Sequence, residues 1–94
     1  MPAGKLTEAQ ITENLNTATG WELKDGEITR FYKFKDFSEA MAFVNKIAGL
    51  AEAADHHPDI DIRYNKVRLT LSTHSAGGLT EKDFTLARRI DSLS

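Results

Sequence analysis

Hydrophobic residues between positions 36 and 55 recur at helical spacing, and this pattern predicts one long central helix. Asp36 and Glu39 suit its first turn, because an acceptor side chain before a helix and an acidic one three residues later form a box-like start. The apolar surface is wider than a single stripe, so we expect the helix to pack against its own sheet and also against a partner. Its members are Met41, Phe43, Val44, Ile47, Ala48, Leu50, Ala51 and Ala54.

The segment 21–34 alternates polar and apolar residues around Asp25-Gly26, which predicts a β-hairpin with a type I′ turn. Phe31 falls on the opposite face from the other large apolar residues, which indicates that this second face is not fully solvated. The residues of the first face are Ile28, Tyr32 and Phe34.

A second hairpin is predicted between positions 59 and 71, where apolar and charged residues alternate strictly. We place its turn at Asn65-Lys66 and interpret Tyr64 as the last inward-facing residue of its strand. The apolar face of the hairpin consists of Ile60, Ile62, Tyr64, Val67, Leu69 and Leu71, and the polar face of the first strand of Asp59, Asp61 and Arg63.

Two other segments share one helix-start motif, Leu6-Thr7-Glu8-Ala9-Gln10-Ile11 and Leu79-Thr80-Glu81-Lys82-Asp83-Phe84. In each, threonine is the N-cap and the third helical residue offers an acceptor side chain. They predict a first helix from about residue 8 to Thr17 and a last helix after the loop at 74–78. The element order is therefore helix, two strands, helix, two strands, helix. This order predicts an α+β fold, a four-stranded antiparallel sheet with three helices on one face.

Length and composition narrow the possible functions. The chain of 94 residues suits one domain spanning residues 1–94. A chain this short must build a deep pocket from few residues or share the pocket between subunits, so we expect an oligomer. The net charge of -2, the pI of about 5.9 and the scattered Lys and Arg argue against direct nucleic acid binding. The chain has no cysteine, signal peptide or apolar run of spanning length, so we expect a cytoplasmic protein without disulfides or membrane association.

The most unusual stretch is EAADHHPDIDIRY, residues 52–64, which sets His56 and His57 side by side. Pro58 disfavours helical geometry in His57, so His57 should extend while His56 closes the last helical turn. Glu52 lies four residues before His56, and on a helix its carboxylate would face that ring. A structural reading remains open for both rings, since a histidine at a helix C-terminus interacts favourably with the helix dipole in any protein.

Four further residues have both a structural and a chemical reading. His74 precedes Ser-Ala-Gly-Gly in a flexible loop, where it is either a surface residue or a functional one. Asp83 is explained by its capping box, and Asp55 by a solvated helix end. Trp21 is more typical of a core or a pocket wall than of a reactive group.

Three histidines could also bind zinc or iron. Adjacent histidines rarely converge on one ion, however, and the i, i+4 histidine pair of a helical zinc site is absent because Glu52 occupies its first place. We therefore expect no metal.

The spacing of these residues resembles the signature of the pterin-4a-carbinolamine dehydratases. The resemblance extends over nearly the whole chain, including the Gly20-Trp21 pair and the run ITRFYKFKDFSEAMAFVNKIAGLAE. A lone HHP would be weak, but a match in so many parts is specific. The residues that carry this signature are, in chain order, Glu52, His56, His57, Pro58, Tyr64, His74 and Asp83.

The resemblance implies the fold expected above and a reaction, loss of water from 4a-hydroxytetrahydropterin to give quinonoid dihydropterin. This step recycles the cofactor of aromatic amino-acid hydroxylases, with the pterin as substrate and no metal or added cofactor. It further implies that His56 and His74 are the acid-base pair and that His57 binds substrate. Supporting residues would be Glu52 beside His56, with Asp55, Pro58, Asp83 and Trp21 around the pocket.

Two alternatives stay open. An animal member of the family also stabilises dimers of a homeodomain transcription factor through helical surface, and the apolar central helix would suit such binding or self-assembly as a dimer or tetramer. The other alternative is a pterin-binding protein without turnover. The complete histidine set favours an enzyme, because an interaction module has no need of three imidazoles at fixed spacing.

Overall fold

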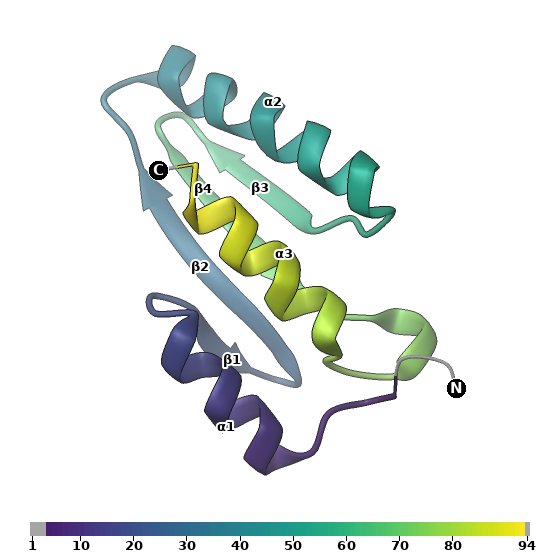
Figure 1. Ribbon diagram of the computed structural model, residues 1–94. Coiled ribbons are helices and arrows are strands. Elements are labelled where there is room, and N and C mark those ends of the chain that lie inside the picture. Colours follow the sequence, from purple (N-terminus) through teal and green to yellow (C-terminus); the bar gives the residue numbers. More distant parts are fainter. Residues whose placement is uncertain (1–3, 94) are drawn as a thin grey trace.

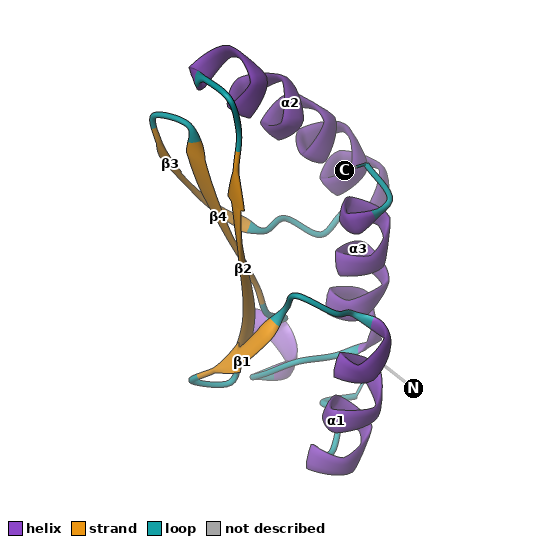
Figure 2. Ribbon diagram, turned by 90° about the vertical axis from the view of Figure 1, so that its left-hand side faces the viewer, coloured by secondary structure: helices purple, strands orange, loops and turns teal. Residues whose placement is uncertain are grey.

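Four antiparallel strands form one layer of the protein, and three helices cover one face of it (Figures 1 and 2). The computed structural model describes residues 4–93. This arrangement confirms the predicted fold class. The elements are α1 (Glu8–Thr17), β1 (Glu22–Lys24), β2 (Glu27–Lys33), α2 (Phe37–Ala54), β3 (Asp59–Arg63), β4 (Lys66–Leu71), the short 3₁₀ helix η1 (His74–Ala76) and α3 (Glu81–Asp91).

The strand order is β1-β2-β4-β3, so β2 and β4 form the centre of the sheet and β1 and β3 its edges. Ile28 pairs with Leu71 and Tyr32 with Val67 across the central strands. These side chains point toward the helices and are buried, whereas Phe31 on the other face is 69% exposed. The predicted faces of the first hairpin are therefore confirmed.

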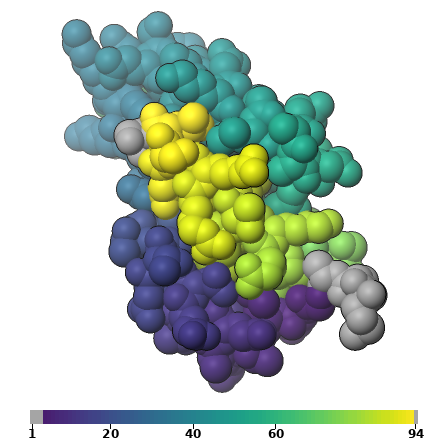
Figure 3. Space-filling view, in the orientation of Figure 1, coloured from purple at the N-terminus to yellow at the C-terminus, as the bar shows by residue number. Residues whose placement is uncertain are grey.

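The core lies between the inner face of the sheet and the helices. Helix α3 runs across the middle, between α1 and α2, as the space-filling view shows (Figure 3). Burying a large apolar side chain contributes about 1.5 to 3 kcal/mol, so this layer supplies most of the stability that holds the site in place. Its fully buried large apolar residues are Ile28, Ile47, Val67, Leu69, Leu71, Leu79, Phe84, Leu86 and Ile90.

The two hairpin turns differ in how well the sequence predicted them. Asp25 and Gly26 have φ of 53° and 77°, which confirms the type I′ turn of the first hairpin. In the second hairpin Arg63 pairs with Lys66, so the two turn residues are Tyr64 and Asn65 rather than Asn65 and Lys66.

Tyr64 is therefore not the last inward residue of its strand, and that prediction is wrong. It lies in the turn at φ 56° and is 66% exposed. The register is set by Asn65, whose side-chain amide donates to the carbonyl of Phe34 at 2.9 Å and whose own carbonyl accepts from the Phe34 N–H at 2.8 Å. These two bonds tie the turn to the end of β2.

The helix starts follow the predicted capping chemistry. Thr7 and Gln10 form a reciprocal box at α1, and Thr80 and Asp83 form the same box at α3. At α2 Asp36 accepts from the Glu39 N–H, but the Glu39 carboxylate accepts from the N–H of Lys35, one residue before the cap. No helix within residues 4–93 has the length and apolar character needed to cross a bilayer.

Candidate functional site

The C-terminal end of α2 directs the two adjacent histidines. Asp55 adopts a left-handed conformation, with φ 51° and ψ 43°, and its N–H bonds to the Glu52 carbonyl at 3.3 Å. The N–H of His56 reaches back to the carbonyl of Ala51 at 3.1 Å. This pair of bonds is a Schellman motif with aspartate, which tolerates the left-handed region, in the place that glycine usually takes. The motif takes His56 off the helix surface.

His56 turns toward α3 and pairs with Asp83. Its Nε2 lies 2.6 Å from Asp83 Oδ1, and the side chains are 11% and 0% exposed. The prediction that Glu52 faces and orients His56 is therefore wrong. It assumed that the helix continues through His56, whereas the left-handed residue Asp55 reverses the chain first.

The second carboxylate oxygen of Asp83 is also bonded. Oδ2 accepts from the Thr80 backbone N–H at 2.9 Å and from the Thr73 hydroxyl at 2.8 Å. Asp83 thus caps α3 and holds a histidine at once, with one oxygen for each task. A buried charge is costly unless it is paired and hydrogen-bonded, and here both oxygens have partners.

His57 lies outside α2, as expected for the residue before Pro58. Its Nε2 lies 2.5 Å from Glu52 Oε2, so Glu52 holds His57 rather than His56. These side chains are 57% and 77% exposed, and exposed pairs contribute little to stability. The pair therefore orients an accessible imidazole without anchoring the fold.

His74 is exposed and opens η1, directly after Thr73. The loop is more regular than the flexible segment predicted, because Thr73 and Gly78 form a two-bond bridge of 3.0 and 3.3 Å. Gly77 closes the turn at φ 74°, a conformation that favours glycine. The bond from Thr73 to Asp83 places the His74 loop beside the same buried carboxylate that holds His56.

The structure does not bring Trp21 to the histidines within this chain. Trp21 is 5% exposed, and its Nε1–H donates to Asp91 at 3.0 and 3.1 Å from the two carboxylate oxygens. Asp91 lies eight residues after Asp83 on α3, which is about 12 Å along the helix axis. Trp21 belongs to the core at the other end of α3.

Asp91 is the centre of a polar cluster that sequence reasoning missed. It accepts from Arg30 Nη1 at 2.7 Å and from the Tyr32 hydroxyl at 2.8 Å, and the Arg30 guanidinium lies 4.6 Å from the centre of the Tyr32 ring. Burial, followed by the hydrogen bond to Asp91, raises the pKa of Tyr32 well above its ordinary value. We name Trp21, Arg30, Tyr32 and Asp91 the Asp91 cluster.

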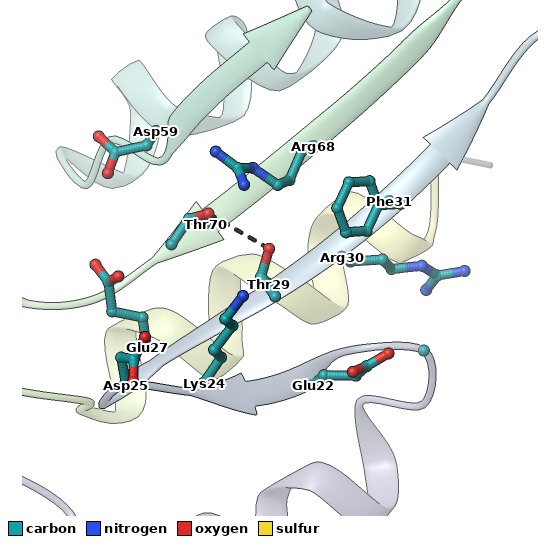
Figure 4. A pocket seen from close by; sticks show the side chains of 11 residues that line it. Glu22, Lys24, Asp25, Glu27, Thr29, Arg30, Phe31, Asp59, Arg68 and Thr70 are labelled. Atoms are coloured by element: carbon teal, nitrogen blue, oxygen red, sulfur yellow. Dashed lines mark hydrogen bonds between the residues drawn. The ribbon is translucent and has the colours of Figure 1, made fainter.

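Two hollows differ in their relation to the histidines. One of about 560 Å³ lies on the helix-free face of the sheet, where Glu27, Thr29, Arg68 and other polar side chains line it (Figure 4). None of the three histidines lines that hollow.

The other hollow, a groove of about 310 Å³ between α2 and α3, has His56 in its wall. Small-molecule pockets begin at about this volume, so the α2–α3 groove is large enough for a flat bicyclic ligand. The rest of the groove lining is Ala53, Ala54, Glu81, Lys82, Thr85, Leu86 and Arg89.

No three histidine or carboxylate side chains within residues 4–93 converge into a metal-binding group. Instead, two of the histidines each pair with a carboxylate, His56 with Asp83 and His57 with Glu52. Such pairs suit proton transfer, since each carboxylate orients an imidazole, the side chain that proteins most often use as a general acid or base.

The sequence profile of the family described as pterin 4 alpha carbinolamine dehydratase matches residues 4–93. The chain belongs to this family. A relative from Chloroflexus aurantiacus is 57% identical over 89 residues, covering 95% of this chain and 96% of its own. One from Acidobacterium capsulatum is 58% identical over 89 residues, covering 95% and 97%. Both are provisionally named pterin-4-alpha-carbinolamine dehydratases.

Solved structures agree on the fold and differ in described role. A transcriptional coactivator/pterin dehydratase from Brucella melitensis has a TM-score of 0.92 and 43% identity, covering 96% of this chain and 98% of its own. A pterin dehydratase-like RuBisCO assembly factor of the alpha-carboxysome has a TM-score of 0.64 and 26% identity, covering 78% and 84%. Relatives with this fold therefore include proteins described by assembly or regulatory roles.

Proposed function

We propose that this protein is a pterin-4a-carbinolamine dehydratase that removes water from 4a-hydroxytetrahydropterin. The observation that carries the proposal is the His56–Asp83 pair, a histidine held at 2.6 Å by a fully buried carboxylate in the wall of a groove. A protein that only binds partners has no need of a histidine held by a buried carboxylate at a groove. Membership of the dehydratase family supports the same reaction.

The reaction needs one proton donated and one removed. The bond between C4a and the hydroxyl oxygen breaks, an acid protonates the departing hydroxide to water, and a base takes a ring N–H proton to leave the quinonoid dihydropterin. No net redox change occurs. Histidine serves either role at neutral pH, and each such proton transfer contributes roughly 10²- to 10⁴-fold.

His56 and His74 are the proposed acid-base pair, and His57 is the proposed substrate-binding histidine. Asp83 holds His56 directly and holds the His74 loop through Thr73, so one carboxylate positions both reacting groups. Glu52 orients His57 from the last turn of α2. Pterin is the substrate in this scheme, and we propose that turnover requires neither a metal nor an added cofactor.

The direct test is the decay of 4a-hydroxytetrahydropterin, generated in place and followed by stopped-flow absorbance. We expect chelator-treated protein to accelerate the decay in a saturable way. A decay rate equal to that in buffer would remove the enzyme proposal. Activity lost to the chelator and restored by zinc would favour the metal alternative.

The wider setting is also proposed. The reaction would recycle tetrahydropterin for an aromatic amino-acid hydroxylase in the cytoplasm. Small residues on α2, among them Ala42, Ala48 and Gly49, are exposed, and we propose that this surface is covered in a homodimer or tetramer. Light scattering coupled to size-exclusion chromatography tests this, and a monomer at micromolar concentration would contradict it.

A second candidate function is protein binding, favoured by the assembly and coactivator roles of the two structural relatives. Exposed large apolar side chains would suit it, notably Phe31 at 69% and Phe37 at 48%. The turnover assay distinguishes this candidate from the first. A protein that acts only by binding partners through these surfaces would not use its histidines and would not accelerate the dehydration.

A further inference from the structure

A buried chain of two threonine hydroxyl groups ends on Asp83. Thr73 and Thr80 are 5% and 0% exposed, and their Oγ1 atoms lie 2.8 Å apart. The Thr73 hydroxyl also lies 2.8 Å from Asp83 Oδ2, and Thr80 Oγ1 accepts from the Lys82 N–H at 3.3 Å. Buried hydroxyl pairs of this kind are not required by a capping box, which uses Thr80 and Asp83 alone.

The direction of each bond in this chain follows from counting hydrogens. A hydroxyl carries a single hydrogen, and Asp83 Oδ2 has none to give while it accepts from the Thr80 N–H. The Thr73 hydrogen therefore points at Asp83, and the bond between the two threonines must use the hydrogen of Thr80. Donation runs one way, from the Lys82 N–H to Thr80, from Thr80 to Thr73, and from Thr73 to Asp83.

This direction fixes where a proton can reside in the His56–Asp83 pair. Oδ2 has two donors aimed at it and no room for a hydrogen of its own, so a proton shared by the pair lies between Asp83 Oδ1 and His56 Nε2. In its neutral state His56 then carries its hydrogen on Nε2, and Nδ1 is the nitrogen with a lone pair. Hydrogen-bonded chains of this kind also polarise one another.

We infer that Thr73 and Thr80 are positioning residues of the dehydratase site, which hold Asp83 as an acceptor and thereby fix His56 as the Nε2–H tautomer. His56 then exchanges protons with the substrate through Nδ1. The inference rests on the proposed function for its effect on turnover. Its structural part, the fixed tautomer, stands apart from turnover and is measurable without substrate.

Thr73 has a second task because it directly precedes His74. Its backbone forms the bridge to Gly78 that closes the His74 loop, while its hydroxyl bonds Asp83. The same residue therefore sets the distance between the loop that carries His74 and the carboxylate that holds His56. Losing the hydroxyl should loosen both histidines together, which lowers kcat more than it raises KM.

The test compares Thr73→Val, which keeps the shape but removes the hydroxyl, with Thr73→Ser, which restores it. We expect Thr73→Val to lower kcat by about 10- to 100-fold, the range that a small misplacement of reacting groups produces, and Thr73→Ser to return most of the rate. Thr70→Val is the matched control, since Thr70 lies on β4 three residues before Thr73, lines the helix-free hollow, and its hydroxyl lies 3.4 Å from that of Thr29. Wild-type kcat in Thr73→Val, or no rescue by serine, would overturn the inference.

Nitrogen-15 NMR of the histidine rings gives the readout that does not depend on turnover. At a pH where His56 is neutral, we expect one protonated Nε2 and one bare Nδ1 in the wild type and in Thr73→Ser, and averaged tautomer signals in Thr73→Val. A wild-type protein with the expected tautomer but no dehydratase activity would overturn the proposed function and leave the fixed tautomer standing. An unchanged spectrum in Thr73→Val would overturn the positioning role.

Thr80→Val supplies the same comparison if Thr73→Val does not fold, because the Thr80 backbone N–H still bonds Asp83 in that variant. The double variant adds a further check. If the hydroxyls act in one chain, the combined loss of kcat is smaller than the product of the two single losses, whereas independent hydroxyls would give the full product.

Discussion

Helix α3 carries an aspartate at each end, and the two are built into different kinds of site. Asp83 in the first turn is bonded by a histidine and two threonines, and it is fully buried. Asp91 in the last turn is bonded by Arg30, Tyr32 and Trp21, and its side chain is 24% exposed. One carboxylate is paired with an imidazole, and the other with guanidinium, phenol and indole donors.

The helix dipole sharpens the difference. A negative charge is favoured in the first turn of a helix and disfavoured in the last. The helix dipole therefore already favours the charge of Asp83. Its carboxylate can be paired with an imidazole in place of a lysine or arginine side chain. Asp91 stands at the unfavourable end, and the guanidinium of Arg30 at 2.7 Å compensates it. The N-terminal end of α3 is suited to chemistry, while the Asp91 cluster is suited to fastening α3 to β2 and to the segment before β1.

His56→Ala, at the Asp83 end of α3, should lower kcat far more than any substitution in the Asp91 cluster. Removing the proposed acid-base group should lower kcat by about 10²- to 10⁴-fold while the protein stays folded. His57→Ala, at the exposed neighbour, should raise KM more than it lowers kcat. Steady-state kinetics with circular dichroism as the folding check measures both, and equal kcat in His56→Ala and wild type would show that this end of α3 is not catalytic.

Asp91→Asn should have the converse effect. The amide keeps the shape but removes the charge that faces Arg30 and is hydrogen-bonded by Tyr32, so the free energy of unfolding should fall by about 1 to 3 kcal/mol. Turnover below the unfolding temperature should match the wild type. Urea unfolding and the pterin assay on the same sample test this, and a stable variant without turnover would move Asp91 into the catalytic account.

Alkaline pH should weaken the Asp91 cluster specifically. The folded state raises the pKa of Tyr32, first through burial and then through its bond to Asp91. The unfolded chain therefore loses the Tyr32 proton near pH 10, at a lower pH than the folded protein does. This contribution to stability is complete below pH 10 and declines as pH rises above it. Tyr32→Phe should show a shallower fall of the unfolding temperature above pH 10, and parallel curves would contradict the raised pKa.

Asp55→Gly should have the smallest effect and tests the turn that aims His56. Glycine adopts the left-handed conformation of Asp55 without strain, so stability should rise by about 0.5 kcal/mol. Turnover should stay unchanged if Asp55 only shapes the turn. Thermal unfolding and kinetics give the answer, and a loss of turnover would instead place the Asp55 carboxylate in the site.

Local sequence patterns predicted the fold well because they report on short-range physics. The Thr7 and Thr80 boxes and the Asp25-Gly26 turn each depend on residues within a few positions, and all were confirmed. The predicted pairing of Glu52 with His56 was wrong. The cause is also local, the conformation of a single residue, but the sequence signals it only weakly. Aspartate at position 55 is a less common left-handed residue than glycine, so the pattern alone favoured a helix that continued to His56.

The rest of the site is made of residues that are far apart in the sequence. No periodic pattern in the sequence indicates that such residues meet in the fold. Asp91 lies 61 residues from Arg30 and 70 from Trp21 in sequence, and only the packed fold brings them together. Thr73 gave no signal either, because a threonine at a strand end is ordinary. The resemblance to the dehydratase signature predicted Asp83 and the histidines as site residues, but which carboxylate pairs with which histidine was visible only in the structure.

Asp83→Asn measured beside Asp91→Asn tests the contrast between the two ends most directly. An amide at position 83 cannot accept from His56, Thr73 and the Thr80 N–H together, so the fixed tautomer of His56 is lost. We predict that kcat for 4a-hydroxytetrahydropterin falls by at least about 10²-fold in folded Asp83→Asn and stays at the wild-type value in Asp91→Asn. Wild-type kcat in Asp83→Asn, or equal losses in the two variants, would contradict this account.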